Sequence, residues 1–337
     1  MRALVLTKRG TPDDALGVQE WPDPEVGNGQ VRIRVRAAGL NFADVLARVG
    51  LYPDAPKPPA VMGYEVAGEI ESVGPASDGF QPGERVMAGT RFNGFAELVT
   101  ADIGNVIRIP EGMSFEQAAA VPVNYGTAYA AIALLAAVRP GETVLVHAAA
   151  GGVGIAALQL LRDRGAIVIG TASASKHEAV RAEGAEHVID YRAQDVKQEV
   201  SKITGGHGVD AVLDALGTFR ESYTMLRPGG RMVIYGASQL LTGDRRNMAK
   251  ALRAVVRMPR FNALKLMNEN RSVMGLNLLK LWDDRGSLEE IMEPLAELIE
   301  RGVIKPVVAE TFPFERAGEA HRYIQERRNV GKVVLTP

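Results

Sequence analysis

The feature that most constrains the fold is an alternation of apolar and amphipathic segments from about residue 142 onward. The apolar segments are 142–150 (ETVLVHAAA), 166–172 (AIVIGTA), 187–191 (HVIDY), 210–217 (DAVLDALG) and 231–237 (RMVIYGA). Each has the length of a buried strand, and the segments between them have the length of helices. Buried strands that alternate with helices form a parallel sheet with helices on both faces. We therefore expect an α/β fold with a doubly wound parallel sheet.

The first of these strands is followed by a glycine-rich loop, residues 149–154 (AAGGVG). It matches the pattern G-x-G-x-x-G except that Ala149 replaces the first glycine. Gly151 lets the backbone approach a pyrophosphate, Gly154 lets the next helix lie close to the strand, and that helix N-terminus attracts negative charge. An ordinary tight turn is the alternative, but the position between a strand and a helix favours a dinucleotide site.

The end of the second strand indicates which dinucleotide binds. Chains that bind NAD usually carry Asp or Glu here to hold the ribose 2′-hydroxyl. Residues 170–176 read GTASASK, with hydroxyls and a cation but no acid. A cation in the first turn of a helix is unfavourable without an anion nearby, so Lys176 favours NADP(H) over a purely solvated role. Ser175 and Glu178 have the spacing of a capping box, and Gly184 follows the predicted helix.

The first 110 residues follow a β-rich pattern instead. Val31, Ile33 and Val35 alternate with arginines, which predicts a strand with one solvated face. Frequent glycines and prolines predict short strands joined by turns, and the proline-rich segment 52–61 predicts a loop. Toward the C-terminus we expect strands at 272–279, 305–312 and 332–336, and helices at 287–301 and 315–327.

The composition is that of an ordinary globular protein. Its 337 residues suggest two domains. Cysteine is absent, which excludes disulfides, thiolate nucleophiles, cysteine-ligated zinc and iron–sulfur clusters. With 39 basic and 40 acidic side chains, the net charge of −1 argues against a nucleic-acid partner. The N-terminal apolar stretch is too short for a signal peptide, which favours a cytoplasmic location.

Residues 118–138 carry no charge and are long enough to cross a bilayer. Pro122, Asn124 and Gly126 interrupt the first half, and alanine dominates the second. We interpret the segment as a turn followed by a buried helix.

Other catalytic motifs are missing from the sequence. There is no G-x-S-x-G motif, and Gly331-Lys332 lacks the upstream glycine of a P-loop. His147, beside the glycine loop, is interpreted as a packed strand-end residue rather than a proton donor. The acidic pairs 283–284 and 289–290 are interpreted as solvated or helix N-terminal charges. No metal-ligand spacing is found among the histidines, which are His147, His177, His187, His207 and His321.

Together these features resemble the medium-chain dehydrogenase/reductase superfamily, in particular its zinc-free quinone oxidoreductase branch, also called zeta-crystallin-like. The similarity extends over residues 1–337, and within the branch it is greatest to the vesicle amine transport protein homologues. The motifs that carry it are NFAD (41–44), GLYP (50–53), GYE (63–65) with Gly68, GERV (83–86), VNYGTAY (123–129), AAGGVG (149–154), GTASASKHEA (170–179), LLTG (240–243) followed by Arg-Asn, and GKVVL (331–335).

This resemblance implies a GroES-like β-rich domain formed by residues 1–123 and 283–337. A Rossmann domain, residues 124–282, would be inserted into it, with the active site in the cleft between them. The residues implied to bind NADP(H) are Asn41 and Thr127 beside the nicotinamide, Gly151, Gly152 and Val153 at the pyrophosphate, Ser173, Lys176 and Tyr191 around the adenosine phosphate, Tyr235, Gly236 and Ser238 along the nicotinamide ribose, and Asn329 from the tail.

The chain departs from the zinc-dependent members of the superfamily. They carry Cys near position 41 and Gly-His-Glu where this chain has Gly63-Tyr64-Glu65. Glu65 alone cannot build a zinc site, and the simplest alternative is a buried carboxylate paired with a nearby arginine. A quinone, or an enone reduced at its β-carbon, needs no Lewis acid because the negative charge is delocalised.

We therefore expect NADPH-dependent hydride transfer to a quinone or enone, with acceleration by positioning. Tyr52 and Asn41 are the candidates to hydrogen-bond the acceptor oxygen, and a role for Tyr52 as a pocket wall is the alternative.

Two other function classes stay open. One is a membrane- or lipid-associated NADP(H)-binding protein with little turnover, and the other is a crystallin-like structural protein.

Residues 272–279 lack the charges or proline that protect an exposed edge strand, so we expect them to pair with a second copy in a homodimer. The basic segment 241–271 is either a solvated helical excursion or a weak contact for anionic lipid.

Overall fold

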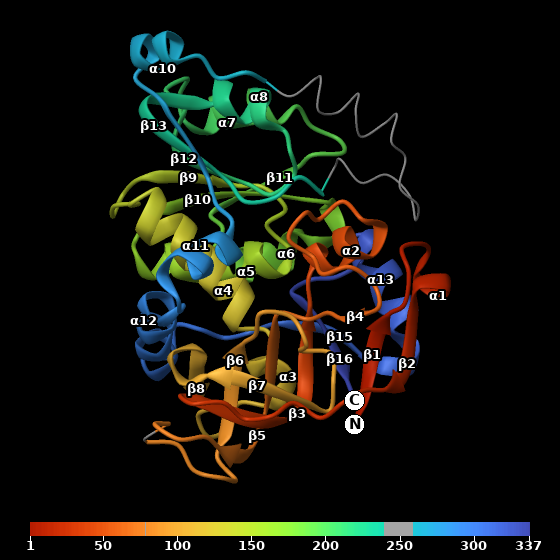
Figure 1. The fold of residues 1–337 in the computed structure, drawn as a ribbon. Coiled ribbons are helices and arrows are strands. Elements are labelled where there is room, and N and C mark those ends of the chain that lie inside the picture. The colour runs from red at the N-terminus through yellow and green to blue at the C-terminus, as the bar shows by residue number, and fades with distance from the viewer. Residues whose placement is uncertain (78, 239–258) are drawn as a thin grey trace. The chain divides into compact units, whose positions relative to one another are not determined.

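The structure is a computed structural model, and it describes residues 1–77, 79–238 and 259–337 (Figure 1). The described residues divide into two compact units. The first contains residues 1–126 and 279–337, and the second contains residues 127–238 and 259–278. The sequence-based division places these boundaries at 123/124 and 282/283.

The second unit is built on a six-stranded parallel sheet (Figure 1). Its strands are β9 (Thr143–Val146), β10 (Ile167–Ala172), β11 (His187–Asp190), β12 (Val209–Asp214), β13 (Leu226–Ile234) and β14 (Ser272–Gly275). Their order, β11-β10-β9-β12-β13-β14, is the 3-2-1-4-5-6 order of a dinucleotide-binding fold. The prediction of a doubly wound parallel sheet is confirmed.

Helices cover this sheet and define its core. They are α5 (Gly152–Asp163), α6 (His177–Ala182), α7 (Val196–Ile203) and α8 (Phe219–Thr224). Val200 of α7 and Phe219 of α8 belong to one buried apolar cluster with Leu145 and Ile169 of the strands. Alternate strand positions face the opposite side, where a Cβ on Gly170 would lie 3.0 Å from Val180 of α6.

The predicted capping box at Ser175 and Glu178 is wrong. A 3₁₀ turn, η3 (Ala174–Lys176), precedes α6, and it is closed by a hydrogen bond from the Lys176 amide to the Ser173 carbonyl at 2.9 Å. The helix therefore begins one residue after Lys176, with no side chain capping its first turn. Ser175 lies inside the 3₁₀ turn, where it cannot act as the helix N-cap.

The segment 272–279 occupies the edge of the sheet, as expected, but it is only partly a strand. β14 ends at Gly275, and α11 (Leu278–Arg285) begins three residues later. Pairing of this edge with a second copy stays a prediction. Of the basic segment 241–271, residues 241–258 lie outside the described residues.

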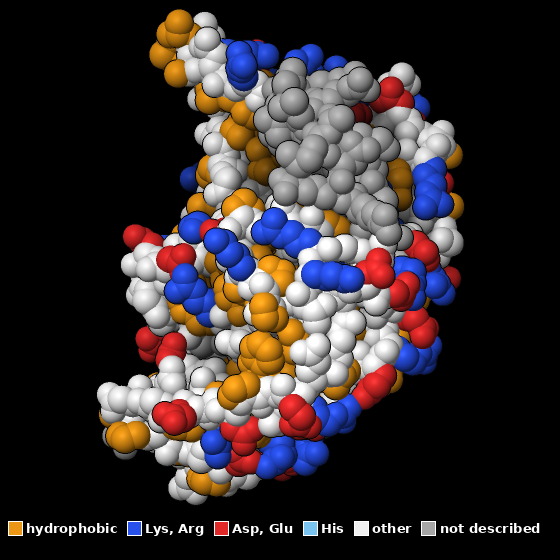
Figure 2. All heavy atoms as spheres, turned by 45° about the vertical axis from the view of Figure 1, so that its right-hand side comes forward, with side chains coloured by type: hydrophobic (Ala, Val, Ile, Leu, Met, Phe, Trp, Pro, Cys, Tyr) orange, Lys and Arg blue, Asp and Glu red, His pale blue; other side chains and the backbone are white. Residues whose placement is uncertain are grey.

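Before β14 lies α10 (Ala263–Glu269), a short helix on the surface of the second unit. Leu264 and Met267 are 66% and 68% exposed, and one helical turn separates them. The hydrophobic side chains at the top of Figure 2, next to Lys and Arg side chains, belong to this part of the chain.

The first unit combines two sheets from distant parts of the sequence. Its strands are β1 (Arg2–Leu6), β2 (Leu16–Glu20), β3 (Gln30–Leu40), β4 (Ala60–Val61), β5 (Glu65–Val73), β6 (Arg85–Gly89), β7 (Leu98–Asp102), β8 (Val106–Arg108), β15 (Val308–Pro313) and β16 (Lys332–Thr336). The larger sheet has the order β15-β16-β3-β5-β6-β8, and β7 also pairs with β3. The smaller sheet has the order β2-β1-β4. In β3, Val31, Ile33 and Val35 are buried, which confirms the alternating pattern.

The C-terminal tail completes the larger sheet, as the resemblance implies. β16 runs antiparallel to β3, with Val334 opposite Gly39. The helical elements of this unit, up to the start of α4, are α1 (Pro12–Ala15), α2 (Phe42–Val49), η1 (Ile103–Asn105), α3 (Phe115–Ala118), α11, α12 (Glu289–Glu300), η5 (Phe314–Arg316) and α13 (Ala317–Gln325). Glu289 and Glu290 lie in the first turn of α12, which confirms their interpretation as helix N-terminal charges.

The uncharged segment 118–138 contains α4 (Pro122–Tyr129) and a π-helical turn, η2 (Ala130–Leu135). By length and composition alone, the stretch Phe115–Leu135 is apolar enough to cross a membrane, but 72% of its most apolar window is buried inside the protein. A turn at residues 119–121 followed by a mostly buried helix agrees with the interpretation, but Pro122, Asn124 and Gly126 lie within α4 and do not interrupt it.

Candidate functional site

The glycine-rich loop follows β9 and leads directly into α5. A Cβ on Gly154 would lie 2.5 Å from the Ala149 carbonyl oxygen and would also clash with that of Ala148, so glycine is required there. Gly151 is the N-cap of α5 and supplies no capping side chain. The first-turn N–H groups and the positive end of the helix dipole therefore suit an anion such as a pyrophosphate.

The candidate adenosine-phosphate residues come together at the carboxyl ends of β10 and β11. These strands pair in parallel with Ala172 opposite Asp190, which places the next residues, Ser173 and Tyr191, beside each other. Lys176 ends the 3₁₀ turn that follows Ser173. The Ala149 amide donates to the Thr171 carbonyl at 3.0 Å, so the glycine loop lies at the same edge of the sheet.

The candidate ribose residues lie at this carboxyl edge too, after β13. The Tyr235 amide donates to the Asp214 carbonyl at 3.1 Å, and the Ser238 amide donates to the Ala215 carbonyl at 3.2 Å. A Cβ on Gly236 would lie 2.8 Å from the Ala215 oxygen. Ligands of open parallel sheets bind at the carboxyl edge, so the observed arrangement fits a dinucleotide.

His147 follows β9 and lies in a buried polar network. Its Nδ1 is 3.2 Å from Thr171 Oγ1, and its Nε2 is 3.1 Å from Ser222 Oγ. Ser222 donates its hydroxyl to Asp214 at 2.8 Å, so the serine oxygen is left to accept from the imidazole. Burial lowers the pKa of His147. The interpretation as a packed, uncharged histidine is consistent with this network.

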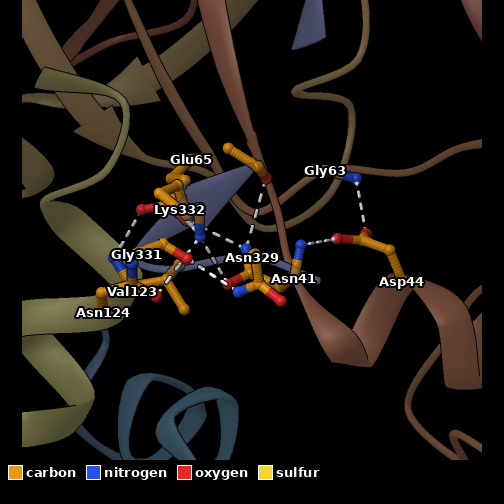
Figure 3. A network of polar contacts seen from close by, with 10 residues as sticks. Asn41, Asp44, Gly63, Glu65, Val123, Asn124, Asn329, Gly331 and Lys332 are labelled. Atoms are coloured by element: carbon orange, nitrogen blue, oxygen red, sulfur yellow. Dashed lines mark hydrogen bonds and ion pairs between the residues drawn. The ribbon is translucent and has the colours of Figure 1, made fainter. Parts of the chain in front are cut away.

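In the first unit, Glu65 and Lys332 form an ion pair (Figure 3). Both side chains are almost fully buried. Lys332 Nζ also donates to Asn41 Oδ1 at 2.7 Å and to Asn124 Oδ1 at 3.4 Å. The partner of Glu65 is therefore a lysine of the C-terminal tail and not the arginine that the sequence suggested. Nothing local in the sequence marked Lys332 for this role.

The second carboxylate oxygen of Glu65 is 2.8 Å from the Val123 amide, in the first turn of α4 (Figure 3). This helix also contains Asn124 and the candidate residue Thr127, both buried. The ion pair thus fixes the start of the helix that carries Thr127.

Asn41 is held rigidly within this network. Its amide nitrogen donates to Glu65 Oε1 at 2.9 Å and to the Gly39 carbonyl at 3.3 Å, while its oxygen accepts from Lys332. Both amide hydrogens therefore have acceptors in the protein, and we assign Asn41 to positioning rather than to donation to an acceptor. Asn329 donates to the Gly331 carbonyl at 2.8 Å and so stabilises the turn before Lys332.

Asp44 is a second buried carboxylate beside this network. It accepts hydrogen bonds from the amides of Asn41 at 2.8 Å and Gly63 at 3.3 Å (Figure 3). Burial raises its pKa to about 7, and the two amide donors oppose that shift.

Tyr52 lies in the loop after α2 and is half-buried. Its ring is 6.2 Å from that of Tyr64 in an edge-to-face arrangement. Burial raises the pKa of Tyr52 to about 12. The phenol is therefore protonated at neutral pH and can donate a hydrogen bond. In the described part of the chain, no group of three or more His, Asp or Glu side chains is placed to hold a metal ion.

Two protein-family models match this chain. The alcohol dehydrogenase GroES-like domain matches residues 27–125, and the zinc-binding dehydrogenase model matches residues 183–335. The synaptic vesicle membrane protein VAT-1 homolog of Rattus norvegicus is 42% identical over 342 residues, which cover 100% of this chain and 84% of that protein.

Solved structures of oxidoreductases are similar to this chain over nearly its whole length. Escherichia coli quinone oxidoreductase complexed with NADPH is similar with a TM-score of 0.86 and 30% identity, over 100% of both chains. The CurK enoyl reductase is similar with a TM-score of 0.86 and 31% identity, over 99% of this chain and 98% of that chain.

Proposed function

The chain belongs to the medium-chain dehydrogenase/reductase superfamily, and on that basis we propose that it uses NADPH to reduce a quinone or a related enone without zinc. The observation that carries this proposal is the carboxyl edge of the parallel sheet. There the glycine loop lies beside Ser173, Lys176 and Tyr191, and the end of β10 has no acid to hold a ribose 2′-hydroxyl. Hydroxyls and an ammonium group suit a 2′-phosphate.

The residues of this chain divide the work of binding and positioning. When bound, the reduced cofactor would supply a hydride to a conjugated carbon of the acceptor. The backbone at Gly151–Val153 would hold the pyrophosphate, and Lys176 would pair with the 2′-phosphate. Tyr52 donates a hydrogen bond to the acceptor oxygen and keeps its proton, because its pKa is about 12. The reduced oxygen then takes a proton from water.

The surroundings of Glu65 support a reaction without zinc. The chain contains no cysteine, although one of the matching family models is named for zinc binding. The carboxylate of Glu65 is already neutralised by Lys332 and hydrogen-bonded by Asn41 and Val123. A metal ion at this carboxylate would have to displace a buried ammonium group.

Two of the similar structures support the two acceptor classes. One is a quinone oxidoreductase complexed with NADPH, and the other is an enoyl reductase. In both classes the carbonyl group is conjugated with a carbon–carbon double bond, so charge that arrives with the hydride is spread onto oxygen.

A second candidate is a lipid-associated NADP(H)-binding protein. It is favoured by the exposed Leu264 and Met267 on α10, with Lys265 between them. If α10 binds anionic bilayers, co-pelleting with phosphatidylserine vesicles should fall in the Leu264→Ser/Met267→Ser variant and at high salt.

The test of the enzyme function is NADPH oxidation with a panel of quinones and enones. The protein is first treated with a chelator, and its metal content is measured. We expect steady oxidation of NADPH by at least one acceptor, unchanged by chelation. No turnover with any acceptor contradicts the enzyme function, and loss of turnover together with zinc contradicts the zinc-free mechanism.

A further inference from the structure

Tyr64 carries a buried hydroxyl that has no role in the proposed binding of NADPH. The residue is only 5% exposed, and its hydroxyl oxygen has no hydrogen-bond partner in the described part of the chain. Buried hydroxyl groups nearly always have a partner, because leaving one unpaired costs free energy. The structure shows no hydrogen bond from this hydroxyl to the carboxylate of Asp44, which accepts from the amides of Asn41 and Gly63. The hydroxyl of Tyr64 is therefore left for a partner that the protein does not supply, either a water molecule or a ligand.

Two aromatic rings flank that of Tyr64. The ring centroids of Tyr52 and Tyr64 are 6.2 Å apart, and those of Tyr64 and Phe92 are 5.1 Å apart. Tyr52 and Phe92 are both half-buried, so the cluster extends from the interior to the surface of its unit. Flat conjugated molecules bind well to such a cluster, because their faces and edges make favourable contacts with aromatic rings.

The loop that carries Phe92 is held in a strained conformation. Phe92 has a φ angle of +77°, in the left-handed region that bulky residues avoid, whereas Asn93, at +62°, is of a type that adopts this region more readily. Hydrogen bonds from the Thr90 amide to the Tyr64 carbonyl at 2.8 Å and from the Asn93 amide to the Val61 carbonyl at 3.2 Å hold the loop in place. Such strain persists where the surrounding structure enforces it, and ligand clamps are a common place for it.

We propose that the hydroxyl of Tyr64 donates a hydrogen bond to the carbonyl oxygen of the acceptor. The conjugated plane of the acceptor then contacts the rings of Tyr52 and Phe92. This inference rests on the proposed reduction of a quinone or enone. When the acceptor takes up a hydride, which bound NADPH would supply, an electron pair would move onto this oxygen. The hydrogen bond from Tyr64 stabilises the resulting negative charge. Water then supplies the proton, and the phenol keeps its own.

The unpartnered hydroxyl makes an unusual prediction about stability. In most proteins, replacing a buried tyrosine by phenylalanine lowers the melting temperature, because a hydrogen bond is lost. Here Tyr64→Phe removes a group with no partner in the protein and keeps the ring. We expect the melting temperature without ligand to be unchanged or higher, and NADPH affinity to be unchanged.

The matched control is Tyr223→Phe. Tyr223 lies in the second unit, where the side chains of Glu269 and Arg271 lie close to its hydroxyl. Both variants lose one tyrosine hydroxyl and keep the ring, but only the hydroxyl of Tyr64 is proposed to bind the acceptor. Any general effect of such a loss on folding should therefore appear in both.

The experiment measures kcat and KM for the acceptor with NADPH. It also measures the affinity of the acceptor for the protein loaded with NADP⁺, a complex that cannot transfer a hydride. For Tyr64→Phe we expect kcat to fall about 10- to 100-fold, with KM changing much less, as for a charge-assisted hydrogen bond that strengthens in the transition state. Acceptor affinity for the NADP⁺ complex should fall by a smaller factor. Tyr223→Phe should leave both unchanged.

Two outcomes overturn the assignment of Tyr64. They are an unchanged kcat in Tyr64→Phe, whatever its melting temperature, and an equal loss of kcat in the Tyr223→Phe control. Each requires that the wild-type protein turns over the acceptor. Absence of turnover in the wild type is a different result, and it overturns the proposed function itself.

Discussion

Lys332 and Glu65 are 267 residues apart in the sequence, and their side chains form an ion pair in which they are 2% and 0% exposed. The pair joins β16 of the C-terminal tail to β5 of the N-terminal region. Asn41, Asn124 and the Val123 amide complete its hydrogen bonds. A buried pair of charges is tolerated only when such bonds are in place.

We expect Lys332→Met to lower the free energy of unfolding by about 3–5 kcal/mol, because Glu65 is left as an unpaired buried charge. The double variant Glu65→Gln/Lys332→Met should recover part of the loss. The control is Arg316→Met, which breaks an exposed pair with Glu319 and should change stability far less, because solvent screens that pair. Urea unfolding measures all three. Equal effects of Lys332→Met and Arg316→Met would contradict the importance of the buried pair.

The buried carboxyl of Asp44 should make stability depend on pH. Its folded-state pKa is about 7, above the value near 4 of an exposed carboxyl. Between these values the folded state keeps the proton that the unfolded state has lost. The stabilisation from Asp44 is therefore complete below about pH 4 and is lost as the pH rises through 7.

The free energy of unfolding of the wild type should thus fall by about 2–3 kcal/mol more between pH 5 and pH 8 than that of Asp44→Asn. The variant is less stable overall, because its amide can accept only one of the two backbone hydrogen bonds. Parallel pH profiles for the two proteins would rule out a raised pKa at Asp44.

Lys176 should determine the preference for NADPH over NADH. Removal of a charge-assisted contact in Lys176→Ala should weaken NADPH binding by about 1.5–3 kcal/mol and leave NADH binding nearly unchanged. Calorimetry with each cofactor measures this difference. Lys202→Ala, which removes an exposed lysine of α7, is the control and should affect neither cofactor. Equal losses of NADPH and NADH affinity in Lys176→Ala would sink the assignment.

The glycine loop should tolerate no side chain at Gly154. A Cβ there meets the carbonyl oxygens of Ala148 and Ala149, so Gly154→Ala must shift the loop away from the pyrophosphate. We expect NADPH affinity to fall at least tenfold. Gly275→Ala, at an extended position of the same unit with open space around it, should bind NADPH normally. If Gly154→Ala binds as well as the control, the loop does not hold the cofactor.

Much of the fold could be predicted because its signals are local. Alternating apolar residues marked β3, and buried apolar runs separated by helices marked the parallel sheet. The sequence did not predict that the strand in segment 272–279 ends at Gly275, because the apolar residues of this segment suit a strand and a buried helix equally well. The start of α6 was missed because the 3₁₀ turn at Ala174–Lys176 moved it past Ser175.

The site could be predicted only in part. The glycine loop is contiguous in sequence, and its geometry follows from the spacing of its residues. The pairing of Glu65 with Lys332 depends on how β16 pairs with β3, which no local pattern encodes. The unpaired hydroxyl of Tyr64 is also invisible in the sequence, since it depends on which groups the fold leaves out of reach.

The central claim is that the protein transfers a hydride from NADPH to a conjugated acceptor. The most direct measurement uses NADPH carrying deuterium at the transferred position of nicotinamide C4, with an enone as acceptor and mass spectrometry of the product. Each product molecule should carry one deuterium at the β-carbon, and chelation should leave the rate unchanged. Product without deuterium, or no product while NADPH stays bound, would contradict this claim.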